Sequence, residues 1–149
     1  MRITSGQGFA PAVTGRQKVE RLQEEISKLP QYEPETTHTF HAGMYCREVF
    51  FQADSLVVGR VHKKEHFFLV VYGTVLITED TDAVEITGPK LVKGMPGVKR
   101  SVYMVTDALL TTFHVTDPKS VEDVEDELME YDPRSTFTVG NKLKVKEIT

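Results

Sequence analysis

The sequence has one cysteine, no tryptophan and no long hydrophobic run, and each of these shortages argues against a class of protein. Cys46 is the single cysteine, so no disulfide can form within the chain, which fits a reducing compartment. The longest apolar run, from Phe67 to Tyr72, is far too short to span a bilayer. The first residues lack the apolar segment of a secretory signal. We therefore expect a cytoplasmic protein.

Positive charge is also in short supply. Eighteen basic residues face 22 acidic ones, and the formal net charge of −4 argues against general nucleic-acid binding. Without tryptophan, a base-stacking platform would have to use Phe or Tyr, and none is arranged in that way. A length of 149 residues suits one domain, or one domain with arms.

The middle of the chain, residues 36–116, has a residue pattern typical of β-strands. Runs of β-branched and aromatic residues alternate there with turn residues. The pattern predicts strands at about 37–41, 44–51, 55–62, 66–78, 83–87, 90–93, 100–106 and 109–116. Several short strands at this spacing predict an all-β sandwich or closed barrel, and the absence of helical patterns between them disfavours βαβ units.

An N-terminal arm, residues 1–35, contains a predicted helix. Apolar residues recur at helical spacing from Val19 to Leu29, Thr14 can serve as the N-cap, and Pro30 ends the pattern. We expect this helix either to pack on the β-structure or to serve as a dimer or partner helix.

A C-terminal arm, residues 117–149, begins with a second predicted helix. Asp117 as N-cap followed by Pro118 predicts the start of an acidic helix, which Pro133 ends. Residues 136–149 add one strand or form a tail. A barrel closes without such arms, so we expect the arms to stabilise an oligomer or to contact a protein partner.

The candidate chemistry centres on His62 and His66. On one straight strand, residues four apart lie about 13 Å from each other, which is too far to share a metal ion. The polar triplet from Lys63 to Glu65 stands between two apolar runs and favours a turn instead. The two histidines would then end one strand and begin the next, within metal-ligand reach of each other.

The segment around these histidines resembles the first sequence motif of the cupin superfamily. That motif runs His-x-His, three or four residues, Glu, six residues, Gly. Counting back from Gly73 places His66 at the Glu position, His62 at the second His position and Arg60 at the first. The resemblance implies a cupin, or jelly-roll, barrel, to which the arms add a flanking N-terminal helix and a C-terminal helix with a tail.

A second stretch, from Gly88 to Met104, resembles the second cupin motif, whose core is Pro-x-Gly-x-x-His. With Gly97 as its glycine, the His position holds Arg100. The usual metal cage of the family is three His and one Glu. Only two of the four matching residues here are competent metal ligands, because Arg stays protonated. These four residues are Arg60, His62, His66 and Arg100.

His114 offers a third ligand. It lies in the last predicted strand of the barrel, which in a jelly roll neighbours the strand that begins near His66. If His114 points inward, Thr112 does too, and Phe113 points outward. A site of three histidines would leave positions open for water or substrate. The resemblance implies a divalent ion such as Fe, Mn, Ni or Zn.

The alternative occupant of the pocket is an anion. Arg60 and Arg100, with Lys64 and Lys99, could gather beside the histidines and bind a phosphate or carboxylate, and Tyr72 could add a hydroxyl. The two lysines fit equally well as turn residues that point to water.

Two functions therefore stay open. The first is a small cupin that binds a divalent metal, whether or not it is an enzyme acting on a small molecule, with Glu65 and Tyr72 as the candidate bases. The second is a non-catalytic cupin that binds an anion or another protein, or whose pocket is vestigial. We expect a homodimer, because cupins often dimerise through the barrel, and we expect no membrane or nucleic-acid partner.

A weaker resemblance bears on the second function. Three segments resemble small cupin-like proteins of tailed bacteriophages, and they are His62–His66, Pro96–Arg100 and Thr111–Thr116. That resemblance implies a virion or host-interaction component, located in the bacterial host cytoplasm or in the virion.

Overall fold

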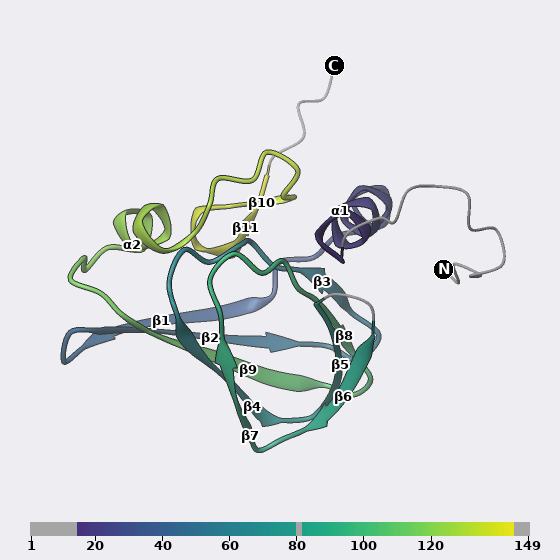
Figure 1. Ribbon diagram of the computed structural model, residues 1–149, viewed down its shortest axis with the longest axis horizontal. Coiled ribbons are helices and arrows are strands. Elements are labelled where there is room, and N and C mark those ends of the chain that lie inside the picture. The colour runs from purple at the N-terminus through teal and green to yellow at the C-terminus, as the bar shows by residue number, and fades with distance from the viewer. Residues whose placement is uncertain (1–14, 80–81, 145–149) are drawn as a thin grey trace, which may run out of the picture.

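The computed structural model describes residues 15–79 and 82–144, and antiparallel strands are their main secondary structure (Figure 1). One sheet has five strands in the spatial order β1-β2-β9-β4-β7, and these are β1 (Glu35–His41), β2 (Met44–Phe51), β9 (Ala108–Val115), β4 (His66–Tyr72) and β7 (Lys90–Gly94). The other has four strands in the order β3-β8-β5-β6, and these are β3 (Leu56–Val58), β8 (Ser101–Met104), β5 (Thr74–Thr78) and β6 (Ala83–Thr87). This arrangement is consistent with the predicted jelly roll.

The two sheets share one hydrophobic core. The five-stranded sheet contributes Val49, Phe51, Phe68, Val70, Ala108 and Leu110, and the four-stranded sheet contributes Val75, Ile77, Val102 and Met104. Side chains alternate between the two faces of each strand, so burial follows a period of two residues. In β4, for example, Phe68 and Val70 are buried, whereas Phe67 is 47% exposed. The same alternation decides which polar side chains point inward.

The strand predicted over residues 66–78 is wrong, because the structure divides it into β4 and β5. The two strands belong to different sheets, and Gly73 stands at the corner between them with a φ of 96°. A Cβ at this position would collide with the Asp107 carbonyl and with Ala108. The corner therefore requires glycine, both for its positive φ and for the close approach of the backbone.

Both arms fold back onto the same side of the sheets (Figure 1). The N-terminal arm contains α1 (Gly15–Ile26), which lies beside β3. The C-terminal arm contains α2 (Val121–Leu128), β10 (Phe137–Thr138), the short helix η2 (Val139–Asn141) and β11 (Lys142–Leu143). No helix among the described residues combines the length and the apolar character that crossing a membrane requires.

The helix boundaries differ from the predicted ones. α1 ends at Ile26 rather than at Leu29, and the predicted N-cap Thr14 lies outside the described residues. Asp117 is not the N-cap of α2. Ser120 takes that position, and its hydroxyl accepts a hydrogen bond from the Asp123 N–H at 3.2 Å. A serine whose side chain accepts a hydrogen bond from a first-turn N–H is a strong N-cap. The helix therefore begins after Ser120 and not after Asp117.

A buried carboxylate joins three separate parts of the chain. Asp132 accepts hydrogen bonds from Lys99 Nζ at 2.7 Å and from Gln23 Nε2 at 3.0 Å. The Lys99 and Asp132 side chains are only 3% and 8% exposed. Burial raises the pKa of Asp132, but the hydrogen bonds from Lys99 and Gln23 outweigh it, so the pKa lies below its ordinary value. Asp132 thus ties α1 and the loop before β8 to the C-terminal arm.

We expect Asp132→Ala to lower the free energy of unfolding by about 3 kcal/mol, because it leaves the Lys99 ammonium buried without its partner. Urea denaturation measures this value. The matched control is Glu25→Ala, which removes an ion pair with Lys28 whose side chains are 66% and 69% exposed. The control should cost less than about 0.5 kcal/mol. Similar losses in the two variants would contradict the structural role of Asp132.

Candidate functional site

Three histidine rings gather in one place. The ring centroids of His62 and His66 lie 4.1 Å apart, those of His66 and His114 5.0 Å apart, and those of His62 and His114 5.3 Å apart. Neighbouring planes are tilted by 17° to 33°, so the rings form a loose stack. The sequence prediction that these three residues converge is therefore confirmed.

The turn predicted between His62 and His66 explains their approach. His62 forms an isolated antiparallel bridge with Met129, just after α2, and His66 is the first residue of β4. Opposite His66, on β7, the sequence has Gly94. Any Cβ at that position would collide with the His66 imidazole. The glycine thus leaves the space that the His66 ring fills.

His114 points inward, as strand parity requires. It is 2% exposed, and Leu110 and Thr112 of the same strand line a cavity between the sheets. Its ring also stacks on Tyr45 of β2, with 5.8 Å between centroids, and Tyr45 stacks in turn on Phe40 of β1. The histidine cluster therefore continues an aromatic stack that crosses three strands.

All three histidines have pKa values below the ordinary 6.5. Burial, followed by the mutual repulsion of the histidines, lowers the pKa of His62 to about 2 and that of His114 to about 3. Burial also lowers the pKa of His66, against the hydrogen bond that its Nδ1 shares with the Lys64 carbonyl at 3.2 Å. The rings are therefore neutral at pH 7, so each keeps one nitrogen lone pair.

A cavity of about 170 Å³ lies beside the cluster, and we call it the His cavity. His62 and His66 line it, whereas His114 stacks behind them and is not part of its wall. Apolar side chains form much of the remaining wall, among them Val49, Phe51, Phe68, Val102 and Leu110. Met129 and residues of the C-terminal arm from Ser135 to Asn141 also line it, so that arm covers the cavity.

Three arginines add positive charge to the wall of the His cavity. Arg60 and Arg100 line it, as does Arg47 of β2. Arg100 donates from Nε to Glu79 at 2.8 Å and lies over the Phe68 ring, 5.4 Å from its centroid. Arg60 and Arg100 thus line the same cavity as His62 and His66.

One carboxylate from α2 faces two of these arginines. Glu125 Oε1 lies 3.2 Å from Arg60 Nη1, and Glu125 Oε2 lies 3.1 Å from Arg47 Nη2. The Glu125 side chain is only 4% exposed. Glu125 is the only carboxylate among the described residues that line the His cavity.

The remaining predicted site residues lie elsewhere. Tyr72 is 46% exposed and does not line the cavity, because the pairing of β4 with β9 shifts register between Val70 and Tyr72. Lys64 is at the surface, where it pairs with Glu127 at 2.6 Å. Lys99 does not point to water; it is buried against Asp132.

The sequence reasoning missed Arg47 and Glu125. Arg47 lies on the same face of β2 as the inward residues Tyr45 and Val49. Strand parity alone could therefore have placed it in the interior. Glu125 stands within an acidic run. The signal for its burial is that it shares a helix face with Val121 and Leu128.

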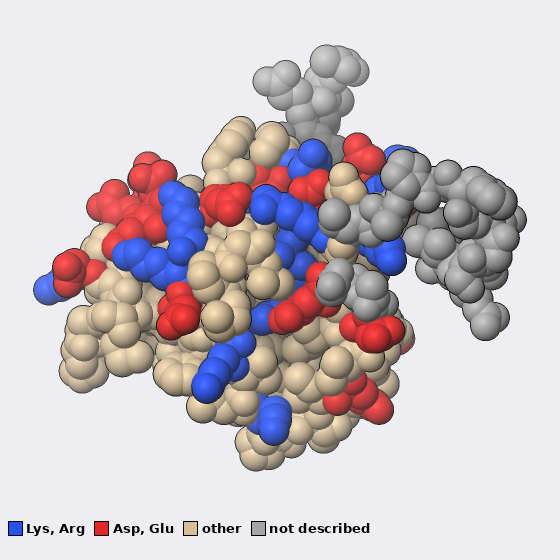
Figure 2. All heavy atoms as spheres, in the orientation of Figure 1, with Lys and Arg blue, Asp and Glu red and all other residues tan. Residues whose placement is uncertain are grey.

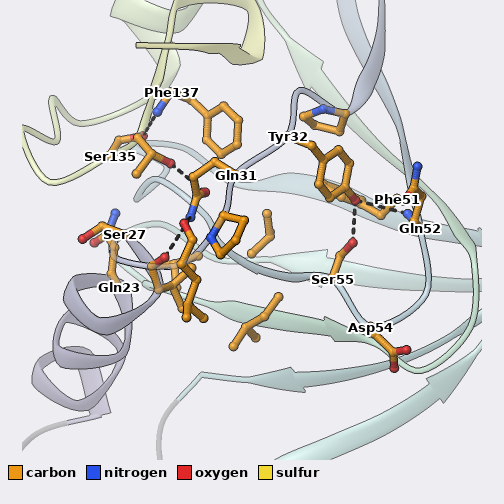
Figure 3. A pocket seen from close by; sticks show the side chains of 18 of the residues that line it. Gln23, Ser27, Gln31, Tyr32, Phe51, Gln52, Asp54, Ser55, Ser135 and Phe137 are labelled. Atoms are coloured by element: carbon orange, nitrogen blue, oxygen red, sulfur yellow. Dashed lines mark hydrogen bonds between the residues drawn. The ribbon is translucent and has the colours of Figure 1, made fainter. Parts of the chain in front are cut away.

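A second cavity, of about 320 Å³, lies between α1, the residues after it, the loop that joins β2 to β3, and residues 135–137 (Figure 3). It contains neither histidine nor arginine. Its polar groups largely satisfy one another: the Tyr32 hydroxyl contacts the Ser55 hydroxyl, and Gln31 Nε2 donates to the Ile26 carbonyl at 2.8 Å. This cavity carries less chemistry than the His cavity, so the His cavity is the candidate site.

The depressed histidine pKa values make stability depend on pH. Unfolded histidine titrates near 6.5, so below that pH the unfolded chain binds more protons than the folded one, and the free energy of unfolding falls. We expect His114 alone to account for a loss of about 2 kcal/mol between pH 7 and pH 5. Denaturant titrations of the metal-free protein at both pH values measure the total.

The comparison variants are His114→Gln, which removes the buried titration, and His41→Gln, which removes an exposed histidine at the end of β1. His41→Gln should keep the full pH dependence, and His114→Gln should lose part of it. An unchanged pH dependence in His114→Gln would refute the account.

Known structures resemble this one, although no protein-family model and no curated protein sequence matches the chain. An RmlC-like cupin from Shewanella frigidimarina matches with a TM-score of 0.50 and 15% identity, over 58% of this chain and 79% of that one. KdgF from Halomonas sp. matches with a TM-score of 0.51 and 8% identity, over 63% of this chain and 87% of that one. A protein of unknown function from Vibrio parahaemolyticus matches with a TM-score of 0.50 and 7% identity, over 56% and 93%.

These identities are too low to transfer an activity, and the likeness concerns the fold. It agrees with the two-sheet topology. The chain has the fold of the cupin superfamily.

Proposed function

We propose that this cupin-fold protein binds a divalent metal ion at the His cavity, with His62 and His66 as ligands and His114 as the third. The observation that carries the proposal is the gathering of three neutral imidazoles, with centroids 4.1 to 5.3 Å apart, at one end of a cavity. Neutral imidazole nitrogen is a common ligand of Fe, Mn, Ni and Zn, so the chemistry of the donors fits.

The placement of the donors fits less well than their chemistry. No three His, Cys, Asp or Glu side chains within residues 15–79 and 82–144 are positioned to hold a metal ion. The rings are stacked, and His114 stands behind the other two. Binding therefore requires the imidazoles to turn. The hydrogen bond between His66 Nδ1 and the Lys64 carbonyl leaves His66 Nε2 as the nitrogen available to an ion.

The proposal concerns binding and assigns no reaction. A bound divalent ion supplies a Lewis acid. The predicted bases are not in position to act beside it, because Glu65 is exposed in the turn before β4 and Tyr72 lies outside the cavity. The cavity carboxylate, Glu125, is held by two arginines. The resemblance to bacteriophage proteins, with its virion or host-interaction role, stays a prediction.

We expect the protein, loaded with Ni²⁺ or Zn²⁺ and freed of excess metal, to retain about one ion per chain by elemental analysis. His62→Ala and His66→Ala should each reduce this content at least about tenfold, because each removes one of a few ligands. His114→Ala should weaken retention as well. His41→Ala is the control and should keep its metal. A wild-type content far below one ion per chain, or equal contents in all variants, would overturn the proposal.

We also propose that two copies of the chain associate through the outer face of the five-stranded sheet. Phe67, Leu91 and Val115 point outward from β4, β7 and β9 and are 47%, 54% and 76% exposed. In Figure 2 the lower part of the molecule, where Figure 1 places β4 and β7, is mostly tan but also has basic side chains. Exposed apolar side chains on one face of a sheet are typical of an interface, and a second copy brings the same side chains to it.

Phe67→Glu should convert the dimer to a monomer of about 16.8 kDa, as measured by light scattering during size-exclusion chromatography. The new carboxylate would have to lose its water within an otherwise apolar contact, with Lys93 across the strand as its one neighbouring cation. Val84→Glu is the matched control, because Val84 is 58% exposed on β6 of the other sheet. A wild-type protein that elutes as a monomer would contradict the proposed association.

A further inference from the structure

The wall of the His cavity has more positive than negative charge, even with the ion pairs of Glu125 counted. Arg47, Arg60 and Arg100 line it, and Glu125 is the single carboxylate of its described wall. Glu79 pairs with Arg100 from outside the cavity. Arg47 and Arg60 therefore share one negative charge between them, in a setting where solvent screens little.

Both guanidinium groups are fixed by other contacts. Arg60 donates from Nε at 3.1 Å and from Nη2 at 2.9 Å to the Glu130 carbonyl, which leaves Nη1 for Glu125. Arg47 donates from Nε to the Tyr45 hydroxyl at 2.8 Å, and Tyr45 contacts His38 Nδ1 at 2.6 Å. Each arginine thus presents one pre-positioned nitrogen towards the same carboxylate, which is the arrangement of a built anion site.

Glu125 occupies this site imperfectly. Although Arg47 Nη2 lies 3.1 Å from Glu125 Oε2, the direction of the contact is poor, and Nη2 is a buried nitrogen without a hydrogen-bond acceptor. A buried donor without an acceptor costs about 1–3 kcal/mol. A carboxylate that enters from the cavity, free of the constraints of α2, can align with both arginines.

We propose that the His cavity binds a small organic carboxylate, whose acid group takes the place of Glu125 between Arg47 and Arg60. The inference shares with the proposed function only the choice of the His cavity as the binding site, and it requires no metal ion. Glu125 then acts as a built-in competitor that holds the site while it is empty. Its release is coupled to α2, which carries it.

The apolar wall indicates the rest of the ligand. Val49, Phe68 and Leu110 line the cavity and belong to the hydrophobic core between the sheets, so the body of the ligand should be apolar. A dry cavity of about 150 Å³ in another protein accommodates benzene, and this cavity measures about 170 Å³. An aromatic or short aliphatic acid therefore matches both size and charge.

Benzoate is the probe, and benzamide, which has nearly the same shape without the charge, is its control. Titrations followed by NMR of the backbone amides should show that wild-type protein binds benzoate and binds benzamide at least about tenfold more weakly. Glu125→Gln should bind benzoate about tenfold more tightly than wild type, because the competitor loses its charge. Arg47→Gln should lose benzoate binding. Benzoate binding that is unchanged in Arg47→Gln, or no binding to Glu125→Gln, would overturn the proposal.

A second measurement uses the wild-type protein and does not depend on how the variants fold. Saturating benzoate should speed hydrogen exchange of the α2 amides, residues 121–128, because displacement of Glu125 removes two ion pairs and the hydrogen bond from the Gly140 N–H. Exchange in β4 and β9 should stay the same or slow. Slower exchange in α2 would contradict displacement.

Metal content separates this inference from the proposed function. Benzoate binding in protein that retains no ion would leave the carboxylate site standing and refute the metal site. Protein that retains one ion per chain but fails both benzoate tests would refute the carboxylate site alone.

Discussion

The contact between Glu125 and two arginines holds the described C-terminal arm over the sheets. Glu125 pairs with Arg47 of β2 and with Arg60 after β3, and it accepts the Gly140 N–H from the far end of the arm. Arg60 binds the Glu130 carbonyl as well. One buried carboxylate therefore connects α2, η2 and both sheets. Buried charges are costly unless they are paired, so each of these charged residues depends on its partners being in place.

The same electrostatics explain why three histidines can share a confined space. Close to Arg47 and Arg100, a protonated imidazole would meet fixed positive charge as well as the cost of burial. Neutral rings avoid both, and they stack on one another and, through His114, on Tyr45. Neutrality is also what a metal ligand requires. Burial, and to a smaller extent the arginines, thus keep His62 and His114 neutral and available as nitrogen ligands.

Local patterns predicted the parts of the molecule that depend on local rules. The polar turn between His62 and His66 brings the two rings together, and strand parity puts His114 on the same face of its strand as Thr112. Patterns failed where a contact distant in sequence decides the outcome. Tyr72 turns outward because of a register shift against β9, Lys99 is buried because Asp132 reaches it from the C-terminal arm, and Glu125 cannot be told from its acidic neighbours until α2 is seen against Arg47. Such contacts join residues 33 or more positions apart, beyond the range of any local period.

Fold likeness by itself leaves the occupant of the cavity open, because the matched structures cover 56% to 63% of this chain. What distinguishes this cavity is its wall. Three arginines line it, two of them at positions where the motif resemblance implies metal ligands, and a carboxylate from α2 faces Arg47 and Arg60. A metal site in which arginines replace two of the ligands binds a metal ion less tightly, unless an anion is bound there as well. Carboxylate and metal would then support each other's binding, since each neutralises part of the charge that opposes the other. In this view Glu125 serves as the anion of the empty site, which explains why a negative group is buried beside the histidines at all.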